Sequence, residues 1–281
     1  MLRVFFSDRV VAAFTIDSPS PRKPGLVVQD WLAHGLPVEI VAPDPVTEED
    51  FALAHDPVHV REILSLQKDN GFFTRDQVVA DSLFYTTGAM VSAAIHAVQS
   101  RTCASAPVSG FHHAMYRSIG AFCTFNGLIV AAQLLKKRGL AKKVGILDYD
   151  MHYGDGTENI REELRLDHVV HYTAGKEFRK PEQAEVFLRS IPEHLSRMRD
   201  CDVVLYQAGA DPHIHDPLGG WLTTEQLRLR DRTVFVTARE MGLPIAWDLA
   251  GGYQEEKDGS IPALLEIHRN TAIECIAAFS R

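Results

Sequence analysis

One short stretch of the sequence, DYDMHYGDGT at 148–157, concentrates side chains that bind metal ions or move protons. If the chain is extended there, Asp148, Asp150 and His152 point to the same side, because side chains alternate along a strand. Two carboxylates and an imidazole at that spacing suit Zn²⁺, which keeps one coordination position open in catalytic sites. The two glycines of the stretch allow a tight turn that directs Asp155 back toward the same side. The pattern predicts a metal site rather than a surface loop.

A second segment, AGADPHIHDPLGG at 208–220, offers the remaining ligand. Asp211 would complete a set of two carboxylates and one imidazole. His213 and His215 are rival ligands on sequence alone, although each by itself is more typical of a loop histidine. Both ligand sets remain open at this point.

Two adjacent histidines, His112 and His113, form the third feature. Neutral histidine is the common general base near pH 7, and an acidic partner fixes its tautomer. Asp148 and Asp155, which remain after metal ligation, are natural partners for the two rings. An isolated histidine pair would indicate little, but the surplus acids and the preceding Gly-Phe favour a functional interpretation.

A Gly-Gly-Tyr turn ending at Tyr253 is the fourth feature. Glycines let the backbone approach a ligand closely, and the tyrosine hydroxyl can then hydrogen-bond a developing oxyanion. The turn by itself is weak evidence, because most tyrosines are packing residues with a solvated tip.

The elements that position these residues are short apolar runs alternating with longer amphipathic ones. Strands are expected at 1–6, 38–41, 144–148, 203–207 and 244–249, and helices at 86–98, 125–137 and 222–241. This alternation predicts an α/β fold with a mostly parallel central sheet flanked by helices. Ligands bind beyond the carboxyl ends of such strands, which is where the four polar motifs fall.

Composition narrows the class of protein further. With 281 residues, 46% hydrophobic and 23% charged, the chain fits a single domain over 1–281. The formal net charge of −8 argues against nucleic acid as a partner. No apolar run approaches the roughly 20 residues that span a bilayer, and no signal peptide is recognisable, so we expect a cytoplasmic protein without a membrane partner. The four cysteines are widely separated, which gives no sign of a disulfide framework or a thiolate zinc site.

The motifs, taken in order, resemble those of the zinc-dependent histone deacetylase superfamily, which includes bacterial deacetylases and acetoin-utilisation proteins. The matching patterns are GFHHA at 110–114, GAFCTFN at 120–126, DYDMHYGDGT at 148–157, AGADPHIHDPLG at 208–219 and LAGGY at 249–253. The resemblance covers most of the chain and implies an arginase/deacetylase-type fold. It also implies one Zn²⁺ per chain, held by Asp150, His152 and Asp211.

The same resemblance implies roles for the remaining polar residues. His113, paired with Asp155, would be the general base and acid. His112, paired with Asp148, would be its electrostatic partner, and Tyr253 would hydrogen-bond the scissile carbonyl. The water proton would pass to His113 and then to the leaving amine.

The resemblance further implies a narrow tunnel for an acylated side chain. Phe122 would line it, Phe178 would form the opposite wall, and the carbonyl of Ala121 would meet the substrate amide. Leu218 stands at the mouth, where polyamine-selective relatives place a glutamate that recognises a cation.

Several positions depart from the family pattern, among them Ala121 and Ala250, which stand where relatives often have glycine. Lys23 stands where relatives have an arginine in an internal channel for acetate. Val169 occupies the place of a serine near a monovalent cation such as K⁺, so binding of that ion stays open. The acidic residue that clamps the substrate is missing, unless Asp76 serves.

The sequence thus predicts a zinc-dependent deacetylase that removes acetyl or other acyl groups from the ε-amine of lysine in a peptide or protein. The nearest alternative is a deacetylase of acetylpolyamines or of another small acylated amine. A two-metal hydrolase of the arginase type shares the fold but needs further bridging carboxylates. A protein that binds acyl-lysine without turnover is the alternative outside enzymes, and the presence of both His113 and Tyr253 argues against it.

Overall fold

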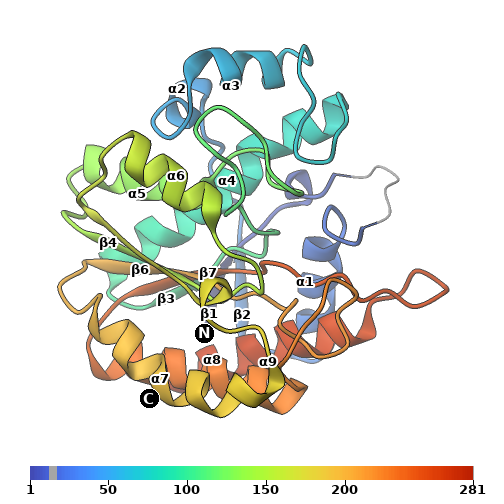
Figure 1. Ribbon diagram of the computed structural model, residues 1–281, viewed down its shortest axis with the longest axis vertical. Helices are drawn as coiled ribbons and strands as arrows, with labels where there is room; N and C mark the ends of the chain where they lie inside the picture. Colours follow the sequence, from blue (N-terminus) through green and yellow to red (C-terminus); the bar gives the residue numbers. More distant parts are fainter. Residues whose placement is uncertain (13–17, 281) are drawn as a thin grey trace.

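A single parallel sheet forms the centre of the computed structural model, which describes residues 1–12 and 18–280 (Figure 1). Within these residues seven strands lie in the order β2-β1-β3-β7-β6-β4-β5, and every neighbouring pair runs parallel. The strands are β1 Leu2–Phe5, β2 Val38–Val41, β3 Cys103–Ser105, β4 Val144–Asp148, β5 Val169–Thr173, β6 Val203–Gln207 and β7 Ile245–Asp248. The predicted fold class is therefore confirmed.

Helices cover both faces of the sheet (Figure 1). Helices α4, α5 and α6 lie on one face, and α1, α7, α8 and α9 pack side by side on the other. The helices are α1 Lys23–Ala33, α2 Glu48–Phe51, α3 Pro57–Leu64, α4 Gln77–Ser100, α5 Gly127–Lys137, α6 Asp155–Glu163, α7 Ala184–Ser196, α8 Thr224–Glu240 and α9 Pro262–Phe279. This two-sided cover explains why every residue of β4, β6 and β7 is buried.

Strand register fixes where the functional loops meet. β4 lies between β5 and β6, with Asp148 opposite both Thr173 and Gln207. Gln207 in turn lies opposite Asp248 on β7. Because all these strands are parallel, the loops that follow β4, β6 and β7 leave the same edge of the sheet.

Most predicted elements are present, with shifts at their ends. The helix expected at 86–98 is the middle of α4, which begins at Gln77. Its N-cap is Asp76, whose Oδ1 accepts a hydrogen bond of 2.7 Å from the backbone N–H of Val78. Strands β3 and β5 and helices α2, α3, α6, α7 and α9 were not predicted. In β5, VVHYT, a histidine whose side chain is 2% exposed interrupts the apolar run.

Helix α4 has 24 residues and is long and apolar enough, by length and composition, to cross a membrane. However, 61% of its most apolar window is buried inside the chain, where α4 contacts α5 and strands β1, β3, β6 and β7. This is the pattern of a core helix, although the sequence analysis did not recognise an apolar run of this length.

Candidate metal centre and active site

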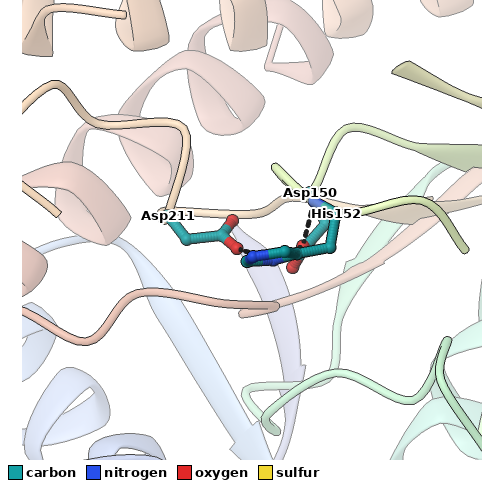
Figure 2. A group of neighbouring side chains, drawn as sticks. All are labelled: Asp150, His152 and Asp211. Carbon is teal, nitrogen blue, oxygen red and sulfur yellow. Dashed lines mark hydrogen bonds and ion pairs between the residues drawn. The ribbon is translucent and has the colours of Figure 1, made fainter. Parts of the chain in front are cut away.

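Asp150, His152 and Asp211 come together at the carboxyl edge of the sheet, with one potential ligand atom of each within 4.8 Å of the others. Asp150 and His152 follow β4, and Asp211 follows the adjacent β6. The Nδ1 atom of His152 lies 2.9 Å from Oδ2 of Asp211 and 3.2 Å from Oδ1 of Asp150. Figure 2 shows the imidazole directed at both carboxylates.

The protein environment of these three side chains fits a divalent cation. Burial and the charge of Asp150 raise the pKa of Asp211 to about 7. Burial opposes ionisation of Asp150 as well, but the charge of His112 and a hydrogen bond from His152 lower its pKa. Hydrogen bonds to the two carboxylates raise the pKa of His152 to about 10. Two fully buried carboxylates this close repel one another, and a bound divalent ion would relieve that repulsion.

Two glycines let the backbone come close to the carboxylates. A Cβ on Gly251, whose φ is +55°, would lie 2.4 Å from Oδ1 of Asp211 and 2.7 Å from Oδ2 of Asp150. A Cβ on Gly209 would lie 2.5 Å from Cα of Asp150. Neither position leaves room for a side chain, so the three loops can pack against one another only with glycine there.

Each of the two adjacent histidines has its own carboxylate. Nδ1 of His112 lies 2.7 Å from Oδ2 of Asp148, and Nδ1 of His113 lies 2.6 Å from Oδ1 of Asp155. Burial alone would lower the pKa of His112, but the charges of Asp148 and Asp150 outweigh it and raise that pKa to about 10. Burial and the neighbouring His112 lower the pKa of His113. Without a bound cation, one ring is charged and the other neutral at pH 7.

Tyr253 faces the same small cavity. The cavity lining includes His112, His113, Phe122, Asp150, Gly251 and Tyr253. Burial raises the pKa of Tyr253 well above its ordinary value, so the hydroxyl stays protonated and available as a donor. The backbone N–H of Tyr253 donates to Oδ2 of Asp216 at 2.8 Å, which anchors the turn to the loop after β6.

Phe122 forms one wall of the cavity. Its ring centroid lies 5.4 Å from that of Tyr253 and 6.0 Å from that of Phe72. Its backbone has a φ of +59°, a conformation that non-glycine residues seldom adopt, and its N–H donates to the carbonyl of Gly71 at 3.0 Å. Ala121 beside it is exposed. Such strain is typical of positions that must present a side chain to a ligand.

Phe178 does not form the opposite wall, so this expectation was wrong. Its ring packs 5.3 Å from Phe187 and 6.1 Å from Trp221, and it is not among the described residues that line the cavity. Phe178 is 9% exposed and belongs to the aromatic cluster around α7. Leu218 is 50% exposed on the loop held by Asp216.

The rival ligands are engaged elsewhere. His213 is hydrogen-bonded through Nε2 to Thr224 and through Nδ1 to Gln254, and His215 is exposed. Among the described residues, Asp150, His152 and Asp211 are the one group with metal-ligand spacing. The set with two histidines is therefore not the one that this structure assembles.

Two departures from the family pattern also have structural outcomes. Val169 lies opposite Val144, at the far end of β5, whereas Thr173 lies opposite Asp148 and its hydroxyl accepts from Gly154 N–H at 3.1 Å. Asp76 caps α4 instead of being free to clamp a substrate.

Lys23 is fully buried at the start of α1. Its Nζ donates to the carbonyl of Leu249, at 2.6 Å, and to that of Gly251. Burial lowers its pKa to about 8. Lys23 thus supports the turn that carries Tyr253, as Asp216 does from the other side. No sequence pattern pointed to Asp216, because an Asp-Pro pair in a loop is common.

A parallel sheet with an Asp-His-Asp group and two His-Asp pairs at its carboxyl edge defines the class of deacetylase-like hydrolases. The chain belongs to the histone deacetylase domain family, which matches residues 20–174. The resemblance inferred from the motifs is therefore confirmed.

Relatives within this class differ in what they act on. An uncharacterized protein of Picosynechococcus is 28% identical over 253 residues, which is 79% of this chain and 84% of that protein. Histone deacetylase 2 of Arabidopsis thaliana is 29% identical over 172 residues, or 52% of this chain and 43% of that protein. Acetylpolyamine amidohydrolase of Mycoplana ramosa is 49% identical, but only over 49 residues, covering 17% of this chain and 14% of that protein.

Solved structures show the same fold. The HDA15 HD domain superposes with a TM-score of 0.80 at 20% identity, covering 99% of this chain and 90% of that domain. An acetylpolyamine aminohydrolase from Burkholderia pseudomallei gives a TM-score of 0.76 at 18% identity, with 99% of both chains covered. Membership in the family supports amide deacetylation as the activity of this chain.

Proposed function

We propose that the chain is a zinc-dependent deacetylase that hydrolyses the amide between an acyl group and the ε-amine of lysine. The observation that carries this proposal is that Asp150 of the ligand group and both histidines of the two His-Asp pairs line the same cavity. Family membership supports the reaction class, and the site chemistry supports the metal.

Asp150, His152 and Asp211 would hold the zinc ion, with the remaining position open to the cavity. When bound, Zn²⁺ supplies Lewis acidity toward a carbonyl oxygen and lowers the pKa of water. The donor set of one nitrogen and two oxygens suits this ion, and one ion suffices because Asp148 and Asp155 already pair with histidines. The two-metal alternative would need those carboxylates as bridging ligands.

His113 would move the proton. Its Nδ1–H donates to Asp155, which leaves Nε2 free to accept a proton from the water that attacks the acyl carbon. The same nitrogen then donates that proton to the departing amine. In the metal-free protein, burial and the neighbouring His112 lower the pKa of His113, which favours the neutral ring that a general base needs.

Tyr253 would stabilise the negative charge that develops on the carbonyl oxygen. A buried, protonated hydroxyl held in place is worth more there than the same hydroxyl in water, because little reorganisation is needed during the reaction. The backbone contacts to Asp216 and Lys23 hold the turn that presents it.

The substrate side of the proposal favours acyl-lysine over acetylpolyamine. Phe122 and Phe72 offer an apolar wall to the methylene chain of a lysine, and the exposed Leu218 offers no charge to a polyamine. Deacetylation of acetylpolyamines is the second candidate function, because two relatives are named as acetylpolyamine amidohydrolases. Cytoplasmic residence, the lack of a nucleic-acid partner and binding of K⁺ stay predictions.

Steady-state hydrolysis of an acetyl-lysine peptide and of N-acetylputrescine by the zinc-loaded protein tests the proposal. We expect a higher kcat/KM with the peptide and loss of both activities in a chelator. Faster hydrolysis of N-acetylputrescine would indicate that the chain is a polyamine deacetylase. Absence of hydrolysis in a fully metallated sample would indicate a protein that binds acyl-lysine without turnover.

A further inference from the structure

Arg230 on α8 is buried to 0% exposure and is directed at the backbone of both ligand-bearing loops. One nitrogen of its guanidinium, Nη1, donates to the carbonyl of Gly209 at 2.6 Å and to the carbonyl of Tyr149 at 3.2 Å. Tyr149 directly precedes Asp150, and Gly209 stands just before Asp211 in the other loop. A single side chain therefore bridges the two segments that carry the carboxylates.

The guanidinium is itself held firmly. Its Nε donates to Oδ1 of Asp231 at 2.8 Å, and Asp231 is 1% exposed. Asp231 also accepts hydrogen bonds from the hydroxyls of Tyr206, at 2.5 Å, and Thr271, at 2.6 Å. These contacts tie Arg230 to β6 and α9, so the position of Nη1 is set by the core of the protein.

The two bridged segments are in tight contact at this point. Gly209 packs against the backbone of Asp150 so closely that a Cβ would lie 2.5 Å from Cα of Asp150. The carboxylates of Asp150 and Asp211 lie just beyond the bridge, where both contact Nδ1 of His152. A contact that holds the two loops from behind would keep the carboxylates at ligand spacing before an ion binds.

A purely stabilising role explains the arrangement less well. Buried ion pairs contribute little net stability compared with apolar residues of similar size. In addition, Nη2 of Arg230 is buried and has no hydrogen-bond partner among the residues that the structure describes. Arg230 thus lies where it can bond the two loop carbonyls, although this position leaves one of its own nitrogen donors without a hydrogen bond.

We propose that Arg230 is a positioning residue that holds Asp150 and Asp211 at metal-ligand spacing before the ion binds. The inference rests on the proposed metal site. It assigns a function to an arginine that the sequence alone places on an ordinary polar helix, where neighbouring arginines are exposed.

The test compares zinc affinity among variants of the full chain, measured on metal-free protein by competition with a chelator. R230M/D231N removes the bridge without leaving an unpaired buried charge, and R230K keeps the charge but not the planar fork. R232M is the matched control, since Arg232 lies on the same helix with its side chain 59% exposed and pairs with Glu274. Thermal unfolding in EDTA reports whether each variant is folded.

We expect the dissociation constant for zinc to rise about 10- to 100-fold in R230M/D231N, which is the usual effect of losing a residue that orients metal ligands. R230K should fall between this variant and the wild type, and R232M should match the wild type. A folded R230M/D231N, or a folded R230K should the double variant not fold, with wild-type affinity would overturn the inference and leave the proposed function intact.

A second readout separates the inference from the metal proposal. In metal-free protein, amide deuterium exchange should be faster at 149–152 and 207–211 in R230M/D231N, or in R230K if only that variant folds, than in the wild type, with R232M unchanged. Equal exchange in those segments contradicts the bridging role, whether or not the protein binds zinc. If the wild type binds no zinc, the proposed function fails, and exchange alone decides whether Arg230 holds the loops.

Discussion

Nδ1 of His113 lies 2.6 Å from Oδ1 of Asp155. A carboxylate can only accept a hydrogen bond, so Nδ1 of His113 carries the hydrogen and Nε2 keeps its lone pair. The tautomer of the proposed general base is therefore fixed by one contact between the segment before α5 and the start of α6. A substitution of Asp155 should therefore change the rate of amide hydrolysis, because it changes which ring nitrogen of His113 carries the hydrogen.

Replacing Asp155 with asparagine tests this contact. The amide can donate to Nδ1 and so favour the tautomer that cannot accept a proton at Nε2, and we expect kcat to fall by about 10²- to 10⁴-fold. Steady-state kinetics on an acetyl-lysine peptide give the number. Asp167→Asn, at an exposed site, is the matched control and should retain the wild-type rate. A normal rate in D155N would show that Asp155 does not set the tautomer.

Tyr253→Phe removes one hydroxyl and leaves the ring that packs 5.4 Å from Phe122. Loss of a positioned oxyanion donor costs about 10²- to 10³-fold in kcat, and we expect little change in KM. Tyr85→Phe on α4 is the control for losing a tyrosine hydroxyl. If both variants are equally active, Tyr253 does not stabilise the transition state.

Removal of the metal should lower thermal stability as well as activity. An ion that binds only the folded state stabilises it by about 2.7 kcal/mol at a free concentration 100 times its dissociation constant. Scanning calorimetry of zinc-loaded and EDTA-treated protein should therefore show a lower Tm after chelation, and Asp211→Asn should reduce the difference. An identical Tm in both samples speaks against a metal bound by the native fold.

Two buried histidines should each lower the stability of the metal-free protein as the pH drops below about 6.5. His55 and His268 are both fully buried, and burial lowers the pKa of His55 to about 3 and that of His268 well below its ordinary value. Below pH 6.5 these two histidines bind protons in the unfolded chain but not in the folded protein. Each of them therefore lowers the free energy of unfolding by up to about 1.4 kcal/mol per pH unit until its folded pKa is reached.

Urea unfolding at pH 7.5 and pH 5 measures this loss. Both ring nitrogens of His268 lack a partner among the described residues, so His268→Leu should flatten the pH dependence by removing one of the groups responsible. His215→Gln, at an exposed site, should leave it unchanged. If His268→Leu shows the same pH dependence as the wild type, His268 does not contribute to the loss of stability at low pH.

The meeting of the polar motifs was predictable from simple geometry, because parallel strands bring the residues after β4, β6 and β7 to one edge. The choice of metal ligands among those residues came from the family resemblance. The extended chain expected at the ligands is instead a bend at 150–152, where the backbone N–H of His152 donates to Oδ1 of Asp150 at 2.9 Å.

Other features depend on packing that the sequence does not encode locally. Phe178 packs against Phe187 and Trp221. Its position depends on these aromatic residues rather than on the residues next to it in the sequence. Arg230 is buried among charged residues of α8, and only the tertiary fold distinguishes it from the exposed Arg232. Helix α9 was missed because the polar residues His268, Thr271 and Glu274 share its buried face and hide the amphipathic period.

The most direct test of the central claim combines metal content with turnover in one sample. Purified protein saturated with zinc and freed of excess ion is analysed for metal per chain and assayed on an acetyl-lysine peptide. The account predicts one zinc per chain, with acetate release that stops on chelation and returns when zinc is restored. A fully zinc-loaded protein that releases no acetate, or activity that requires two manganese ions per chain, would contradict it.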